Sequence, residues 1–139
     1  MAPWLIMLFI GAMDWGFYAY ALIATEGASR VGALYASSNT TALNESPPNT
    51  VCTYALDQLR KMGNVGASMA PPCATGSSVS ASSPVGVAVT SVSGPDGNSA
   101  AQVSVTYLTP IFIPQVIKGA TVTPKQVTIT RTVQMRMRG

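Results

Sequence analysis

The chain opens with an almost wholly apolar run, Ala2–Ala24, that contains one acid, Asp14, near its middle. The run continues without a Pro or Gly-Pro break into Thr25–Ser37. About 20 apolar residues are enough for a helix to cross the hydrocarbon core of a bilayer. A signal peptide has a shorter core that follows basic residues and ends at a small-x-small cleavage site. We therefore predict a membrane helix over residues 1–37. It should also pack against other helices, because an intramembrane carboxylate is costly without a partner.

Small residues recur at every fourth position of this predicted helix. Residues four apart lie on one helix face, and small side chains let helix backbones approach closely in a membrane. An alanine-rich composition can produce such a ridge by chance, but its persistence beyond the apolar run favours a packing surface. The ridge consists of Ala12, Gly16, Tyr20, Ala24, Ala28, Gly32 and Ala36. We predict that its six small residues make assembly contacts.

A polar segment, residues 38–50, follows the helix and contains a Pro-Pro break, which is typical of a linker. Apolar residues then return at helical spacing over Val51–Met62. This predicts a short second helix that Asn49 or Thr50 caps and that Gly63 stops. The linker contains two Asn-x-Ser/Thr sequons, which begin at Asn39 and Asn44. They predict glycosylation only in a cell that has the glycosylation machinery.

Beyond a loop of small residues and proline at 63–83, the apolar period changes from helical to two, which indicates strands. The segment Gly94–Asn98 has the composition of a hairpin turn. We predict a three-stranded antiparallel sheet with strands around Val85–Val89, Val103–Tyr107 and Val127–Met137. The fold class is therefore α+β, with a small extracytoplasmic domain over residues 51–139.

Two features of the sheet region leave alternatives open. Arg131 interrupts the apolar face of the last strand, so it lies at the sheet margin or pairs with an acid such as Asp57. The apolar run Leu108–Ile117 contains two prolines, which are incompatible with a central strand. We expect an extended loop there that covers the sheet, or that touches a neighbouring molecule or the membrane surface.

The two cysteines, Cys52 and Cys73, lie beyond the long helix. An even pair in an exported, loop-rich domain predicts one disulfide. A loop of that size contributes roughly 3 kcal/mol in the chain-entropy model. The alternative is two reduced, buried thiols in a cytosolic domain. No metal or other cofactor is expected, because histidine is absent and two distant thiols make no zinc site.

The sparse charge and the absence of catalytic motifs argue against a nucleic-acid-binding protein and against an enzyme. Only 9% of residues are charged, which suits a protein that is exported or packed in an assembly. The net charge of +3 is scattered along the chain and makes no strong case for nucleic acid as a partner. Catalytic residues are not expected either. The chain has no histidine to activate a nucleophile, no close pair of acids and no Gly-rich phosphate loop after a strand.

Three stretches of the chain together have a recognisable pattern. Met1–Gly11 places a small residue and Pro before a Leu-rich run, Met13–Gly16 has the order acid–aromatic–glycine, and Glu26–Ala36 reads Glu-x-Ala-x-Arg-x-Gly-Ala-x-Tyr-Ala. This pattern resembles the TadE-like pseudopilins of bacterial Tad (tight adherence, type IVc) pilus systems. Val/Thr strands around a Pro-rich apolar loop resemble the family too. On this alignment we expect the chain to lack the family's leader peptide, its Gly cleavage point and the Glu that follows.

The helix, its small ridge and Asp14 favour a structural subunit of a pilus-like extracellular filament. Its helix would be held first in the cytoplasmic membrane, then extracted by the pilus assembly machinery and packed against copies of itself. The alternative, which the family resemblance itself implies, is a minor TadE-like pseudopilin that stays in the membrane and primes assembly. A single-pass anchor that displays a small β domain for adhesion is a third reading. In a filament, Asp14, Glu26 and Arg30 could make polar contacts between subunits. Arg30 lies roughly 24 Å beyond Asp14 along the helix, so a contact between these two would join axially shifted subunits.

Overall fold

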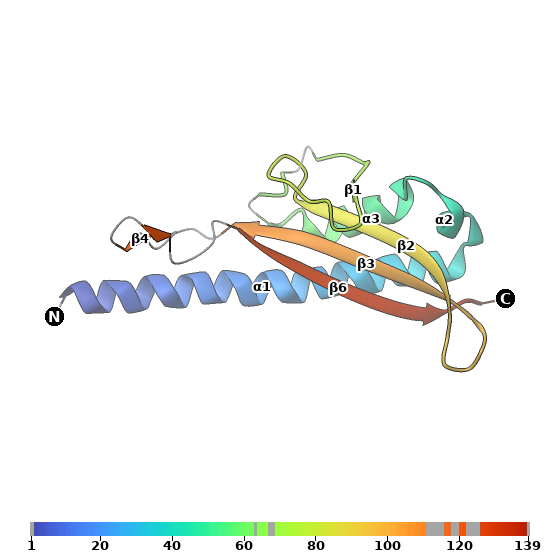
Figure 1. Ribbon diagram of the computed structural model, residues 1–139, viewed down its shortest axis with the longest axis horizontal. Coiled ribbons are helices and arrows are strands. Elements are labelled where there is room, and N and C mark those ends of the chain that lie inside the picture. The colour runs from blue at the N-terminus through green and yellow to red at the C-terminus, as the bar shows by residue number, and fades with distance from the viewer. Residues whose placement is uncertain are drawn as a thin grey trace.

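A single long helix, α1 (Ala2–Ser38), runs through the molecule, and most of the remaining chain packs against its C-terminal half (Figure 1). This computed structural model describes residues 2–62, 64–66, 69–110, 116–117, 120–121 and 126–138. The architecture is α+β, as the hydrophobic pattern predicts. Pro3 is accommodated because the first turn of a helix has no intrahelical donor to lose.

The buried face of α1 consists of small residues. They lie only in the C-terminal half, where small side chains let the sheet approach the helix axis closely. A Cβ built on Gly32 would lie 3.1 Å from a Val51 methyl group and 3.2 Å from a Val103 methyl group. The buried residues of the helix are Ala21, Thr25, Ala28, Ser29, Gly32, Ala33 and Ala36.

The segment predicted as a linker contains a short helix, α2 (Thr40–Asn44). Asn39 is its N-cap: the side-chain oxygen accepts a hydrogen bond from the Thr41 N–H at 3.0 Å. The Asn39 amide nitrogen also donates to the Tyr35 hydroxyl at 3.3 Å. Sequence periodicity does not detect a helix of one turn, because its stability comes from this local cap rather than from an apolar face.

The second predicted helix is present as α3 (Asn49–Leu59), and hydrogen-bonded turns continue it to Met62. The predicted cap is wrong. Pro48 occupies the N-cap position without a side-chain hydrogen bond, and Glu45 instead accepts from the Thr50 N–H at 3.0 Å. Glu45 lies in the loop before α3 and its carboxylate caps the first turn, so neither Asn49 nor Thr50 is needed as a cap. The predicted stop at Gly63 lies outside the described residues.

The three predicted strands are confirmed as β2 (Val85–Ser93), β3 (Ser99–Pro110) and β6 (Gln126–Arg136), all antiparallel. A fourth strand, β1 (Ala74–Thr75), pairs in parallel with β2 and makes the sheet mixed, with the order β1-β2-β3-β6. The prediction of three strands is therefore one too few for this sheet. Two residues are too few to show an alternating pattern, so β1 leaves no signal in the sequence.

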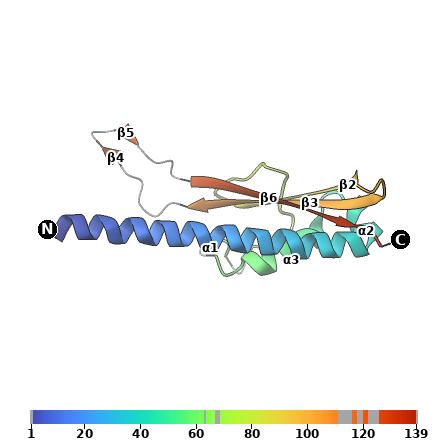
Figure 2. The ribbon, with the colours of Figure 1, turned by 90° about the horizontal axis from the view of Figure 1, so that it is seen from below.

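A separate two-stranded ladder joins β4 (Val116–Ile117) to β5 (Ala120–Thr121). In Figures 1 and 2 this ladder lies beyond the end of the main sheet, on the side of the N-terminal half of α1. The extended loop predicted at 108–117 is corrected at its start, because residues 108–110 complete β3. Pro110 is tolerated as the last residue of a strand. Residues 111–115 lie outside the described part of the chain.

The hairpin between β2 and β3 turns where Gly94–Asn98 predicts it. Gly97 has φ +75°, a conformation that favours glycine. Hydrogen bonds from the Asn98 side chain and backbone hold the pKa of Asp96 below its usual value. Asp96 also lies 3.5 Å from Arg136 at the end of β6, so this ion pair joins the turn to the neighbouring strand.

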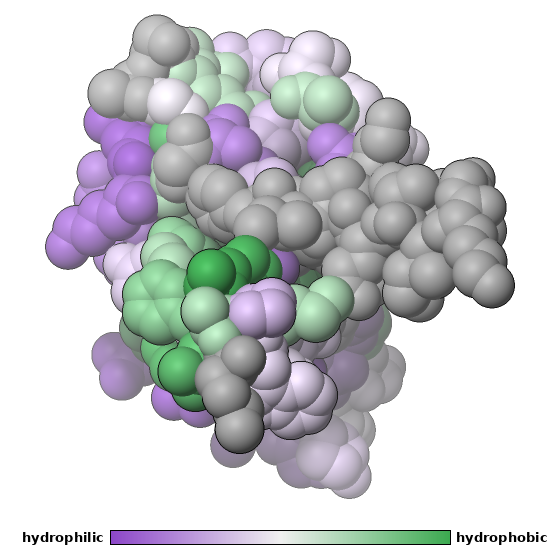
Figure 3. All heavy atoms as spheres, turned by 90° about the vertical axis from the view of Figure 1, so that its left-hand side faces the viewer, coloured by the Kyte–Doolittle hydropathy of each residue, from purple (hydrophilic) through white to green (hydrophobic). Residues whose placement is uncertain are grey.

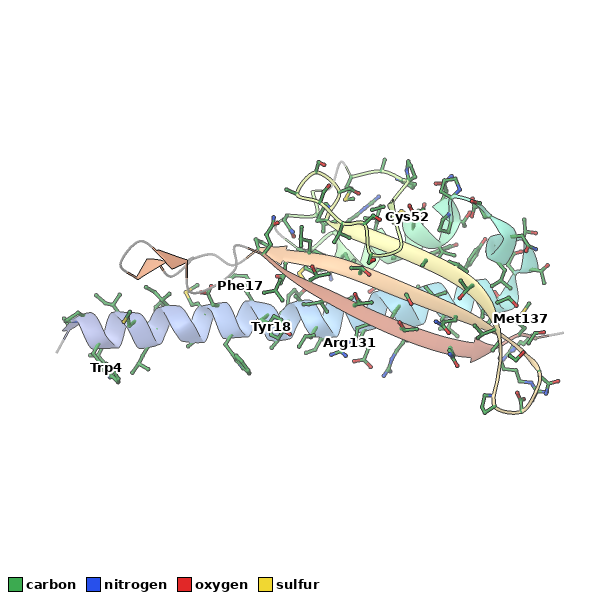
Figure 4. All side chains as sticks on the ribbon, viewed as in Figure 1. Trp4, Phe17, Tyr18, Cys52, Arg131 and Met137 are labelled. Carbon is green, nitrogen blue, oxygen red and sulfur yellow. A yellow bond between two sulfur atoms is a disulfide. The ribbon has the colours of Figure 1, made fainter. Side chains whose placement is uncertain are left out.

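The core lies between the sheet on one side and α1 and α3 on the other. Helix α1 packs under β3 and β6, while α3 packs beside α1 and contacts β2. The predicted disulfide is confirmed: Cys52 of α3 and Cys73, which precedes β1, have their Cα atoms 5.7 Å apart (Figure 4). The bond therefore ties α3 to the segment that enters the sheet.

Arg131 lies on β6, the edge strand of the sheet, with its side chain exposed. The ion pairs within the described ranges are Glu26–Arg30 and Asp96–Arg136, so Arg131 does not pair with Asp57. Of the two explanations left open by the sequence, the sheet margin is the one that the structure supports. The cation is tolerated on the apolar side of the strand because water reaches the edge of the sheet.

Candidate assembly surface on the N-terminal half of α1

The N-terminal half of α1, residues 2–20, projects beyond the four-stranded sheet and buries none of its side chains (Figure 1). Trp4 is 68% exposed and Trp15 is 74% exposed, although large apolar side chains are normally found in cores. Figure 3, viewed from the N-terminal end, shows hydrophobic side chains gathered around this helix. The exposed large side chains of this half are Trp4, Leu5, Ile6, Met7, Leu8, Phe9, Met13, Trp15, Phe17 and Tyr20. This half of the helix therefore needs a cover that the described subunit does not provide.

The dimensions of this surface match a bilayer. Of the described helices, α1 alone has the length and apolar composition to span a membrane. Its exposed half is roughly 28 Å long at 1.5 Å per residue, close to the 30 Å thickness of a hydrocarbon core. Trp4 lies near one end, and Trp15 and Tyr18 lie near the other with their rings 6.3 Å apart. Aromatic residues at both ends of a span are typical of membrane interfaces.

Asp14 lies close to the domain along the axis of α1. Ala21 is the first buried residue of α1 and lies about 10 Å from Asp14 along the axis. Asp14 precedes Gly32 by about five complete helical turns, so the two residues share one helix face. That face is the one that the sheet covers further along. The partly exposed Asp14 carboxyl therefore points to the domain side of the helix, and no described cation pairs with it.

The predicted small ridge is divided between two environments. Ala28, Gly32 and Ala36 are buried against the subunit's own domain, so their small size is accounted for by packing within the subunit. Ala12 and Gly16 are exposed, and Ala24 is half-buried. A Cβ on Gly16 would meet no atom within 4 Å, and a shallow surface groove surrounds this position. Only the N-terminal part of the ridge remains open to a neighbouring molecule.

The other predicted polar contacts of α1 are partly satisfied within the helix. Arg30 donates to Glu26 at 2.5 Å in an i,i+4 ion pair. Both side chains are exposed, so the pair adds little stability. An intersubunit contact of Glu26 or Arg30 would have to replace or share this bond. Asp14 and Arg30 are not brought together within the subunit, and a role between subunits stays a prediction for all three residues.

A cavity of about 250 Å³ lies where α1 meets the end of the sheet. Its wall is mainly apolar and comes from residues that the sequence does not link, including Tyr20 and Ala21 of α1, Met62, Tyr107 and Pro110. Tyr107 donates a hydrogen bond to the Asn64 side-chain oxygen, and the Asn64 amide donates to the Leu108 carbonyl at 2.7 Å. Burial raises the pKa of the Tyr107 hydroxyl. These groups hold the loop after α3 to β3 and form no arrangement of nucleophile and base.

Metal ligation finds no support within the described ranges. They contain no group of three or more acidic or cysteine side chains that could hold an ion. The two cysteines are joined to each other and do not titrate.

No family model, curated protein or solved structure matches the chain.

Proposed function

We propose that the chain is a structural subunit of a pilus-like extracellular filament. The observation that carries the proposal is the exposed half of α1. It is apolar and long enough to cross a bilayer, yet it belongs to the same rigid helix on which the domain is built. A membrane covers this half before assembly, and helices from other copies cover it in the filament core. The domain remains outside in both states.

The disulfide supports an extracytoplasmic domain. Structural disulfides persist in oxidising compartments and are rare in the cytosol. Cys52 and Cys73 are both buried, which suits a structural bond rather than an exposed redox site. The sparse charge of the chain suits a protein whose surface is largely covered in an assembly.

The alternative is a minor TadE-like pseudopilin that remains membrane-anchored and primes or assists pilus assembly. The resemblance in Met13–Gly16 and Glu26–Ala36 favours this reading, because TadE-like proteins are usually minor components. Both readings use the same helix in the same membrane. They differ in how many copies enter a fibre.

The test is to shear the surface of cells that make the chain together with its assembly machinery. The sheared fraction is then examined by electron microscopy and quantitative gel analysis. Filaments that contain the chain as their main protein are expected for a structural subunit. Trace amounts in filaments made of another protein would support the minor pseudopilin. A monomer released only by detergent, with no polymer, would contradict both readings and favour a single-pass anchor for adhesion.

The variant Gly16→Leu provides a matched test of helix packing, with Gly27→Leu as its control. Both glycines lie on α1 and have open space where a Cβ would be. Only Gly16 lies in the exposed half. We expect Gly16→Leu to reduce filament yield while membrane insertion persists, and Gly27→Leu to assemble.

A further inference from the structure

We propose that Asp14 of one copy forms an ion pair with Arg131 of a second, parallel copy that is displaced by about 20 Å along the helix axis. This inference rests on the proposed filament and names one contact within it. Neither residue pairs with another described residue of its own subunit.

Asp14 needs a cation once helices cover the exposed half of α1. A carboxylate removed from water is costly unless it is paired or hydrogen-bonded. Asp14 lies on the helix face that carries the domain, just beyond the end of the sheet. In a filament with helices inside and domains outside, this face points outward. The Asp14 carboxyl therefore faces the layer in which the domains of other copies lie.

The Arg131 side chain points from the sheet toward the helix layer, opposite to the outward direction of the Asp14 carboxyl. It lies opposite Val105 in the register of β3 and β6, and Val105 is fully buried on the side of the sheet that faces α1. The neighbouring inward residue, Ile129, is also buried. Because β6 is the edge strand, the Arg131 side chain is directed toward the helix layer but remains exposed. Another helix can approach it along this open edge.

The other described cations fit less well. Arg30 is bound to Glu26, and Arg136 is bound to Asp96 on the hairpin. Arg60 and Lys61 follow α3 at the end of the domain, where Lys61 lines the cavity beside Ala21. Arg138 lies at the opposite end, where its backbone N–H donates to the Ser37 carbonyl. Arg131 is the one cation of the described chain that faces the helix layer along the open edge of the sheet.

The displacement between the two copies follows from contacts within one subunit. Gly32 packs against Val103, and Val103 is paired with Val133. Arg131 lies two strand residues before Val133, about 7 Å toward the N-terminal end of α1. Asp14 lies about 27 Å from Gly32 in the same direction. Subtracting the two distances places Arg131 about 20 Å from Asp14, toward the C-terminal end of α1. In Figure 4, Arg131 of β6 lies past Phe17 and Tyr18 in that direction.

This separation makes disulfide trapping decisive. A disulfide requires Cα atoms within about 7 Å, so cysteines at positions 14 and 131 cannot join within one subunit. The double variant Asp14→Cys, Arg131→Cys is assembled into filaments, oxidised mildly and run on a non-reducing gel. We expect a ladder of covalent multimers that collapses on reduction. The control is Asp14→Cys, Arg136→Cys, which uses the same strand but the opposite side of the sheet and should give no ladder.

Charge exchange provides a second, independent measurement. Asp14→Lys and Arg131→Glu should each reduce filament yield by at least about tenfold, with membrane insertion monitored in parallel. The combined variant Asp14→Lys, Arg131→Glu should recover most of the yield, because it restores opposite charges. Arg136→Glu combined with Asp14→Lys should show no recovery.

The outcomes separate this contact from the filament itself. Wild-type filaments with no 14–131 ladder and no recovery in the exchanged pair would overturn the ion pair and leave the proposed function standing. A wild-type chain that never enters filaments would overturn the proposed function and the contact together. A ladder that appears equally with position 136 would show nonspecific collision and would also overturn the pairing.

Discussion

The two halves of α1 are parts of one uninterrupted helix, but they are built from different side chains. Residues 21–38 present alanine, glycine, serine and threonine to the domain, and these small residues are buried. Residues 2–20 carry tryptophan, leucine, phenylalanine and methionine, and these large residues are exposed. In both halves the helix has an apolar surface to cover. Within the covered half, small side chains are the ones that are buried, while its large apolar residues Ile23 and Leu34 are exposed like those of the other half.

The sheet that covers one half, and the lipid or helices proposed to cover the other, explain this difference. A β-sheet is a rigid surface, so it can approach the helix closely only where side chains are short, as at Gly32. Lipid chains are fluid and adapt to bulky side chains, which also interdigitate between helices. The boundary lies at Ala21, one residue past the exposed Tyr20. With a boundary at this position, substitutions in the two halves should have separate effects.

The largest difference is expected between Leu56→Ala and Leu8→Ala. Leu56 is fully buried in the core, and Leu8 is mostly exposed in the N-terminal half. Removing a core leucine costs about 2–5 kcal/mol of unfolding free energy, because it leaves a cavity. We expect this loss in Leu56→Ala and none in Leu8→Ala, measured by hydrogen exchange of β3 amides in detergent micelles. Equal losses in both variants would mean that the exposed half supports the domain fold.

The disulfide should stabilise only the domain. Replacing both Cys52 and Cys73 by serine is expected to cost about 3 kcal/mol of unfolding free energy, because the unfolded chain regains the entropy of the open loop. Urea unfolding followed by tyrosine fluorescence measures this loss. Amide exchange in residues 2–20 should be unchanged in the same sample. Faster exchange there would show that the two halves are coupled.

The sequence predicts the elements with strong periodicity and misses those that depend on tertiary contacts. The long helix, α3, the hairpin and the three long strands each show a clear apolar period, and the disulfide follows from the cysteine count and the expected compartment. Strand β1 and helix α2 are too short for a period. The Glu45 cap depends on the path of the preceding loop, which local pattern does not describe.

The candidate surface is partly predictable for the same reason. The apolar length of α1 and the presence of Asp14 are visible in the sequence, and so is the small ridge. The division of that ridge at Ala24 is not visible, because the sheet that covers Ala28 and Gly32 comes from residues far along the chain. The direction of Arg131 depends on the order of strands in the sheet. Sequence periodicity gives its side of the strand but not its place at an open edge.

Glycine substitutions should separate the halves at matched positions. Gly32→Leu forces a large side chain against Val51 and Val103, and overpacking of this kind costs about 1–3 kcal/mol of unfolding free energy. A Cβ at Gly16 would have no atom within 4 Å, and the position lies on the exposed half of α1, so the domain should keep its stability in Gly16→Leu. Thermal unfolding by circular dichroism measures both. A destabilised domain in Gly16→Leu would contradict the boundary at Ala21.

The smallest difference is expected between the two acids of α1. Glu26→Gln removes the ion pair with Arg30, and an exposed i,i+4 pair contributes about 0.3–0.5 kcal/mol at low salt. Added salt should abolish this loss, because exposed charges are screened. Asp14→Asn removes no described contact within the subunit, so the domain of the full chain should unfold as in the wild type at every salt concentration. Urea titrations at two salt concentrations compare the variants. A salt-dependent loss in Asp14→Asn would place a cation beside Asp14 within its own subunit, and the intersubunit pairing with Arg131 would then lose its premise.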